Sequence, residues 1–170
     1  MEVRIADSWT AIDLSFAPWL DSTETLEVLL FVNGDDKVYE WSGGVAEVLS
    51  STATTITKTG TSTWAEDGFY TTGNKTIVIN GVEYTYTGGE DSTTLTGLTA
   101  VSVSAGDVVT QKIVTNATTP TANFNNDFII VNENQLFIGN RTSNIVYCSS
   151  NSDYTDFSVS SPRVPGEGEL

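Results

Sequence analysis

Apolar and polar positions alternate most clearly around Asn80-Gly81. Runs of strand-forming residues, 75–79 and 82–86, flank this dipeptide. Asn-Gly favours a two-residue type I′ turn, because both central positions of that turn need positive φ. The turn fixes the register and divides the cross-strand pairs between two faces of a half-buried antiparallel sheet. The pairs on the more apolar face are Ile79–Val82, Ile77–Tyr84 and Lys75–Tyr86, and those on the other face are Val78–Glu83 and Thr76–Thr85.

Two further hairpins, far apart in the sequence, share one pattern. The first runs from strand 26–32 through the polar turn 33–36 into strand 37–41. The second runs from strand 135–138 through 139–144 into strand 145–149, and one more strand, 127–131, precedes it. Similar hairpins that recur along a chain indicate repeated sheet units. Propeller blades are the natural candidate, because each blade is a short antiparallel meander.

The block between these hairpins has a different character. Residues 46–118 are rich in Thr, Ser and Gly and contain several short strand patterns, enough for a small barrel or sandwich. We therefore predict an all-β fold in which antiparallel, blade-like (propeller-type) hairpins are interrupted by a small β-barrel or sandwich insertion. The predicted parts are a leader at 1–25, a blade-like sheet unit at 26–45 and 119–160, the insertion at 46–118, and a Pro/Gly-rich tail at 161–170.

The leader combines little periodicity with large aromatic residues. Trp9, Phe16 and Trp19 lie in a mostly polar stretch. Aromatic side chains in such a stretch indicate packing contacts, so we expect these three to contact either the rest of this chain or a neighbouring subunit.

Charge and composition exclude several classes of protein. The 170 residues carry a formal charge of −15 and include 7 Lys and Arg, which are scattered along the chain. Direct binding of nucleic acid is not expected, because phosphates require clustered cationic side chains. No apolar run is long enough for a transmembrane helix, and the first residues lack a signal-peptide pattern. We therefore expect no membrane association. The single cysteine, Cys148, excludes an intrachain disulfide and is expected at an ordinary strand position.

Candidate chemistry is sparse. The chain has no histidine, which removes the commonest general base and most zinc sites. A hydrolase that uses two carboxylates stays formally open, but each acidic pair falls in a predicted turn, where solvated acids are expected. These pairs are Asp35-Asp36, Glu66-Asp67 and Glu90-Asp91. We therefore predict no catalytic residue, no cofactor and no enzymatic activity.

Loop oxygens make calcium the most plausible metal. Asn33–Asp36, and Asp153 with Asp156, provide hard oxygen ligands, yet neither has the ligand spacing of an EF-hand. We expect ordinary surface turns at both places and no metal site.

One irregular segment is the best candidate for a contact loop. Trp64, Phe69 and Tyr70 lie in a stretch without strand periodicity. Exposed aromatic rings could stack on a sugar or dock against a protein, whereas the hairpin register directs Tyr84 inward.

Two groups of residues resemble the proteins of tailed bacteriophages. Residues 81–98, followed by 105–109, look like the β insertion of virion proteins, and residues 135–141 and 146–157 are similar to propeller-like segments of tail and nozzle proteins. The resemblance implies a structural subunit of a virion, in the tail or the head-to-tail region and assembled in the host cytoplasm. Its partners would be other virion subunits, in a homo-oligomer or a hetero-assembly. The family supplies no catalytic residue, and this chain departs from a full propeller by having two blade-like units.

Two functions from different classes follow. The first is non-catalytic assembly of a phage virion through edge strands and the aromatic leader. The alternative is a carbohydrate- or receptor-binding β module that uses loop aromatics, a host glycan as ligand and calcium as an aid.

Overall fold

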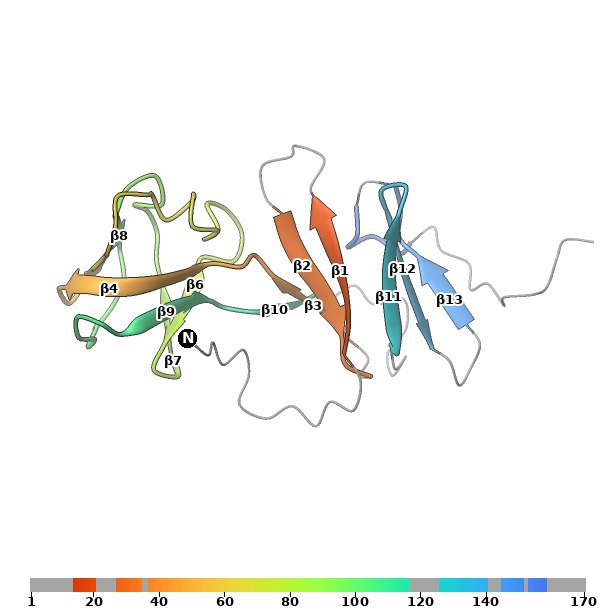
Figure 1. Ribbon diagram of the computed structural model, residues 1–170, viewed down its shortest axis with the longest axis horizontal. Helices are drawn as coiled ribbons and strands as arrows, with labels where there is room; N and C mark the ends of the chain where they lie inside the picture. The colour runs from red at the N-terminus through yellow and green to blue at the C-terminus, as the bar shows by residue number, and fades with distance from the viewer. Residues whose placement is uncertain are drawn as a thin grey trace, which may run out of the picture. The chain divides into compact units, whose positions relative to one another are not determined.

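The computed structural model describes residues 14–20, 27–34, 37–116, 126–140, 145–151 and 153–158. Among these residues every helix-or-strand element is a β-strand, and every strand pair with a described register is antiparallel, so the predicted all-β fold is confirmed. Figure 1 shows the strands, whose bounds are β1 Ser15–Leu20, β2 Glu27–Val32, β3 Val38–Trp41, β4 Val45–Ser51, β5 Thr55–Lys58, β6 Thr76–Ile79, β7 Val82–Thr85, β8 Thr94–Thr96, β9 Val108–Gln111, β10 Val114–Asn116, β11 Phe128–Asn132, β12 Gln135–Asn140 and β13 Ile145–Cys148.

The described residues belong to two compact units. Residues Trp41–Ile113 form one, which we call the inserted unit. The described residues up to Glu40 and from Val114 onward form the other, which we call the flanking unit. Strand β10 begins at Val114 and pairs with β3, so the chain leaves one sheet for the inserted unit and then returns to it.

The inserted unit is a curled six-stranded sheet with the order β7-β6-β9-β4-β5-β8. Its outer strands are brought together beyond β7, where Thr87 N donates to Thr96 O (3.0 Å) and Thr96 N donates to Gly88 O (2.8 Å). These hydrogen bonds satisfy backbone groups that a flat sheet would leave open along its edges. The sheet can therefore enclose a core on its concave side.

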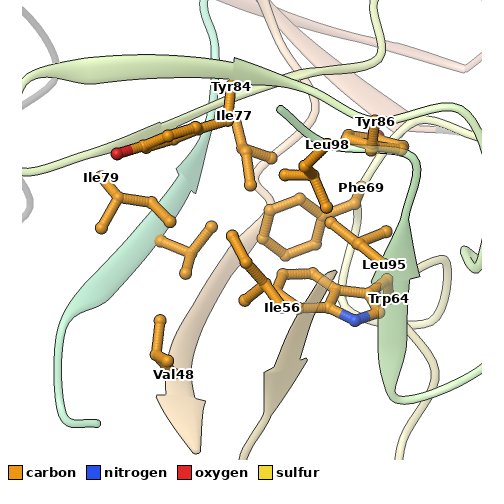
Figure 2. Close-up of a cluster of buried hydrophobic side chains, with 11 residues drawn as sticks. Val48, Ile56, Trp64, Phe69, Ile77, Ile79, Tyr84, Tyr86, Leu95 and Leu98 are labelled. Carbon is orange, nitrogen blue, oxygen red and sulfur yellow. The ribbon is translucent and has the colours of Figure 1, made fainter. Parts of the chain in front are cut away.

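That core is one cluster of aliphatic and aromatic side chains (Figure 2). It is supplied by alternate positions of the strands and by the segment between β5 and β6. Its members are Val48, Ile56, Trp64, Phe69, Ile77, Ile79, Tyr84, Tyr86, Leu95, Leu98 and Val109.

The β6–β7 hairpin has the predicted register. Ile79 pairs with Val82 and Ile77 pairs with Tyr84. At the turn, Asn80 and Gly81 have φ values of 51° and 79°, as a type I′ turn requires. Burial of Ile77, Ile79 and Tyr84 on one side confirms that the more apolar face is the core face.

The flanking unit contains two sheets. The first has the order β1-β2-β3-β10, so its strands follow one another in the sheet in the same order as in the sequence. The second has the order β11-β12-β13 and also follows the chain. Both are antiparallel meanders, the blade-like arrangement predicted for the hairpins at 26–41 and 135–149. The tight turn between β11 and β12 uses Glu133 and Asn134 with φ of 48° and 60°.

Part of the predicted leader is a strand, which corrects the description of residues 1–25 as one irregular segment. Residues Ser15–Leu20 pair with β2 along their whole length, from Ser15 opposite Val32 to Leu20 opposite Glu27. Both faces of this strand carry apolar residues, so it lacks the apolar–polar alternation that marks a half-buried strand. Pro18 is compatible with its position because β1 is an outer strand of its sheet.

The two sheets of the flanking unit pack together. Strand β11 lies against β1 and β2, and Ile129 N donates to Ser15 Oγ at 3.2 Å. On the same side of β1, the ring of Trp19 lies 5.3 Å from that of Tyr154, whose hydroxyl donates to a Glu40 carboxylate oxygen. Side chains on this side are buried: Ala17, Trp19, Val28, Leu30, Val32, Val38, Ile129, Leu136, Ile138 and Tyr147.

Candidate functional site

The predicted contact loop is a compact turn. Thr63 N donates to Glu66 Oε2 (2.7 Å), and Glu66 N donates to Thr63 Oγ1 (3.2 Å), which is the reciprocal arrangement of a capping box. Phe69 N then closes the turn by donating to Trp64 O at 3.1 Å. The pattern Thr63-x-x-Glu66 was a usable sequence signal for this turn, although no regular helix follows it.

This turn points its aromatic residues inward, which corrects the expectation of an exposed contact loop. Trp64, Phe69 and Tyr70 have only 0%, 1% and 7% of their surface exposed. The rings of Trp64 and Phe69 meet edge to face at 4.7 Å, inside the cluster shown in Figure 2. Side chains buried in this way fill the barrel core and present almost no surface to a sugar or a protein.

A buried lysine holds the same turn from β5. Lys58 Nζ lies 2.7 Å from Asp67 Oδ2 and donates to Ser62 Oγ at 2.9 Å, and its side chain has no exposed surface. Ser62 Oγ also donates to Asp67 Oδ1 at 2.8 Å. Desolvation opposes ionisation of Asp67, but the hydrogen bonds from Lys58 and Ser62 outweigh it and lower the pKa of this carboxyl group. The carboxylate therefore neutralises the buried ammonium.

Gln111 fixes the far end of the segment. Its Oε1 accepts from Tyr70 N at 3.2 Å, and its Nε2 donates to Asn74 O and Thr76 O at 2.8 and 2.7 Å. The Tyr86 hydroxyl donates to Tyr70 O at 2.6 Å, and its burial, together with the negative charge of Glu90, raises the pKa of this phenol. These contacts join the backbone of Tyr70, Asn74 and Thr76 to Gln111 of β9 and give its buried amide group hydrogen-bond partners.

Three acids of these pairs have structural partners. Glu66 caps the turn, Asp67 pairs with Lys58, and Glu90 pairs with Lys75. Desolvation opposes ionisation of Glu90, but the hydrogen bond from Lys75, a backbone hydrogen bond and the positive charge of Lys75 together outweigh it and lower the pKa of its carboxyl group. The pair Asp35-Asp36 lies outside the described residues. In the described part of the chain, no group of three or more Cys, Asp or Glu side chains could hold a metal ion.

The candidate calcium ligands Asp153 and Asp156 close local turns. Asp153 Oδ1 accepts from Thr155 N at 2.9 Å, and Asp156 Oδ1 accepts from Ser158 N at 2.8 Å. The Ser158 side chain and backbone lower the pKa of Asp156. The other candidate, Asn33–Asp36, lies partly outside the described residues.

The three leader aromatics have different surroundings. Trp9 lies outside the described residues. Trp19 is buried against Tyr154 of the same chain, which is one of the two contacts expected for it. Phe16 is 52% exposed and lies on the opposite side of β1. Only Phe16 of the described leader aromatics is therefore positioned to contact another molecule.

Phe16 belongs to a larger apolar face, which we call the Phe16 face. Directly opposed residues of antiparallel strands share a face, and Phe16 is opposite Phe31, whose ring stacks on Tyr39 at 5.3 Å. The exposed residues of this face lie along β1, whereas Phe31 on β2 is buried, and Glu27 stands at the rim of the face. The face comprises Phe16, Pro18, Leu20, Leu29, Phe31 and Tyr39.

The second sheet also has an apolar outer side, which we call the Ile130 face. Ile130 alternates with the buried Ile129 and is 54% exposed. Neither face of strands β11, β12 and β13 carries a charged residue. Sequence reasoning recognised these strands but not this surface, because burial on one side of a strand does not reveal whether the other side meets a partner. The face comprises Phe128, Ile130, Phe137, Val146 and Cys148.

Comparisons with protein-family models, with curated proteins and with solved structures find no match for this chain. A search of the described residues for a helix of sufficient length and apolarity to span a lipid bilayer also finds none.

Proposed function

We propose that this chain is a structural subunit of a bacteriophage virion, in the tail or the head-to-tail region, which acts by binding other subunits. The phage assignment rests on the sequence resemblance of residues 81–98, 105–109, 135–141 and 146–157. The observation that supports an assembly role is the exposure of large apolar side chains on strands of the flanking unit, where Phe16, Leu20 and Ile130 are 52%, 51% and 54% exposed. Exposed and largely uncharged sheet faces are typical of surfaces that another protein covers.

The carbohydrate-binding alternative loses its main support. Its residues, Trp64, Phe69 and Tyr70, lie in the core of the inserted unit. A Trp64→Ala substitution would open a large cavity there and destabilise the unit, so a loss of sugar binding by this variant would not identify a sugar site.

Mass spectrometry of purified particles tests the proposal. Tailed particles from the source of this sequence are separated from free protein on a density gradient, and peptides of the chain are quantified across the fractions. We expect the peptides to follow the major capsid and tail proteins at a constant ratio. Peptides found only in the particle-free fractions, with capsid peptides banding elsewhere, would contradict a virion role. Genes for portal, capsid or tail proteins next to this reading frame would give independent support.

A further inference from the structure

We propose that Asn80 is a deamidation site whose reaction is controlled by opening of the β6–β7 hairpin. The reacting group is the side-chain amide of Asn80, the attacking group is the backbone nitrogen of Gly81, and the co-reactant is water. This inference goes beyond the proposed assembly role and does not depend on it, because it concerns the covalent stability of the inserted unit.

The reaction needs an asparagine followed by a residue whose backbone nitrogen is accessible. The Gly81 nitrogen loses its proton to solvent and attacks Cγ of Asn80, and the bond from Cγ to the amide nitrogen breaks, so that this nitrogen takes a proton from solvent and leaves as ammonia. Water then opens the five-membered succinimide ring at either carbonyl and gives aspartate or its β-linked isomer. Glycine has no side chain to hinder the attack, and asparagine is a thermolabile residue. The chain has two Asn-Gly dipeptides, at 33–34 and 80–81.

The tip of the hairpin leaves both reacting groups accessible to solvent. Asn80 and Gly81 are exposed, and a Cβ built on Gly81 would meet nothing within 4 Å. The ladder of β6 and β7 ends with Ile79 opposite Val82, so Gly81 lies outside it. The other dipeptide differs, because Gly34 N donates to the backbone oxygen of residue 126 at 3.0 Å and attack there must first break this hydrogen bond.

The conformation of the turn holds the reacting atoms apart. The φ values of 51° and 79° at Asn80 and Gly81 belong to a type I′ turn, whose first central residue has a ψ of about +30°. At these angles the nitrogen of the next residue lies across the Cα–C bond from Cβ, so Cγ of Asn80 cannot reach Gly81 N. Asn80 must leave the left-handed conformation before the ring can close. The reaction therefore proceeds during local openings, which cost less free energy than global unfolding.

The product would weaken the turn that protects the site. Ile79 pairs with Val109, so the turn lies opposite the start of β9 and the preceding Asp107. Asn80 is close enough to help lower the pKa of Asp107, after the larger effect of the Ser104 backbone. An aspartate at position 80 would add a second carboxylate there, and like charges at short distance repel each other. The β-linked isomer would add Cβ to the main chain, which changes the geometry that a two-residue turn requires.

Peptide mapping by mass spectrometry, after incubation at mildly alkaline pH, measures conversion at both dipeptides. In concentrated guanidinium chloride, Asn33 and Asn80 should convert at similar rates, because each is followed by glycine and no fold protects either. In the folded chain, Asn80 should convert at least about tenfold more slowly than in the denaturant. Equal rates at Asn80 in the two conditions would overturn the control by the hairpin, and no conversion in the denaturant would overturn the site itself.

A substitution that loosens the hairpin and keeps the dipeptide tests the role of local opening. Val82 is 50% exposed beside the turn, and Val82→Gly weakens β7 because glycine has no side chain to pack and is less constrained in a strand. It should speed conversion at Asn80 by at least about threefold in the folded chain and leave the rate in denaturant unchanged. The matched control is Leu49→Gly, which removes a 56% exposed side chain from β4 and should leave the Asn80 rate near that of the wild type. Equal acceleration by both variants, or none by Val82→Gly, would overturn the proposal.

Asn80→Asp reproduces the aspartate product and tests its effect on the turn. It should lower the midpoint of thermal unfolding, and it should cost less in a chain that also carries Asp107→Asn, because one of the two neighbouring carboxylates is then absent. Circular dichroism checks that each variant retains the fold. An Asn80→Asp chain as stable as the wild type would contradict the weakening of the turn by its own product.

Discussion

At the residue scale, the inserted unit depends on polar side chains at core-facing positions of its strands. In β5 the buried positions alternate as Ile56 and Lys58, and in β9 as Val109 and Gln111. A polar side chain that faces the core needs hydrogen-bond or ion-pair partners, because an unpaired buried polar group destabilises the fold. Lys58 finds Asp67 and Ser62, and Gln111 finds backbone groups on both sides of it.

The Lys58–Asp67 pair should contribute more to stability than a surface pair. Asp67→Asn leaves the buried ammonium without its counter-charge, and we expect it to lower the free energy of unfolding of the inserted unit by about 3 kcal/mol. Urea denaturation measures this change. The matched control is Glu83→Gln, which breaks the exposed Lys112–Glu83 pair of the same 2.7 Å length and should cost under about 1 kcal/mol. Equal losses for both variants would contradict the role assigned to burial.

The same pair should give a characteristic pH dependence. The pKa of Asp67 is lowered from its ordinary value of 3.8 by Lys58 and Ser62, against the opposing effect of desolvation. A carboxyl group with a depressed folded-state pKa stabilises the fold fully above its unfolded pKa and loses that contribution as the pH falls through the folded value. The stability difference between the wild type and Asp67→Asn should therefore be constant from neutral pH down to near the ordinary value and shrink below it. A difference that grows on acidification would contradict this assignment.

Residue-level predictions from sequence succeeded where one local rule was sufficient. The inward direction of Tyr84 followed from the hairpin register, and the structure buries it. Trp64 and Phe69 were misjudged because no alternation marks their segment. The turn is held over the core by contacts with distant residues, among them Trp64 N to Ser92 O and Lys58 to Asp67. The burial of Lys58 could have been recognised from the sequence, because Lys58 lies two residues after Ile56 and so on the same face of the strand.

At the element scale, turns with one favoured conformation were predictable, and strands with apolar residues on both faces were not. The Asn80-Gly81 turn fixes its own register, so no distant information is needed. Strand β1 carries apolar residues on both faces, because one face packs on the second sheet and the other is the Phe16 face. Its identity depends on pairing with β2, which lies outside the local pattern.

Close approach of the backbone at Gly89 gives a prediction at this scale. Gly89 has a φ of 93°, and a Cβ built there would lie 2.0 Å from Thr94 O, beside β8. Gly106 has a similar φ of 90°, but a Cβ there would meet nothing within 4 Å. Gly106→Ala should therefore cost about 1 kcal/mol of stability through backbone strain alone. Gly89→Ala should cost roughly 2 to 4 kcal/mol, because the β8 backbone must also move.

Urea denaturation of the two alanine variants under one buffer measures this difference. Their positive φ values are nearly equal, so the extra loss in Gly89→Ala reports the contact with Thr94 rather than the strain. Equal destabilisation by both substitutions would show that the backbone near Thr94 can move at little cost. The close contact between Gly89 and β8 would then not be needed for stability.

At the scale of the whole molecule, the change of composition along the chain pointed to an inserted β block, and the pairing shows where the insertion leaves its host sheet. Residues 108–114 form one strand-like stretch in the sequence, but β9 ends at Gln111 and β10 begins at Val114. The first strand pairs with β6 and β4, and the second pairs with β3. Periodicity cannot detect this change of partner, because it reports which side of a strand is buried and not which distant strand pairs with it.

The pairing of β3 with β10 leads to the last prediction. Glu40 is directly opposite Val114, so the chain leaves and re-enters the first sheet at neighbouring positions. The inserted unit encloses its own buried cluster and brings the outer strands of its sheet together by hydrogen bonds. A small unit with its own core and adjacent ends can fold alone. We therefore expect residues 41–113, expressed by themselves, to unfold cooperatively on heating, with the near-ultraviolet circular dichroism of a packed Trp64.

The complementary deletion completes this test. A chain in which a short glycine-containing turn joins Glu40 to Val114 should keep the flanking unit folded, because β3 and β10 would then form an ordinary hairpin. Nuclear magnetic resonance of each part should give dispersed amide signals that overlay on a subset of those from the full chain. Collapsed, poorly dispersed spectra for residues 41–113 would show that the core around Trp64 needs the flanking unit for its stability. Dispersed spectra that fail to overlay would lead to the same conclusion, because the isolated fold would then differ from the one in the full chain.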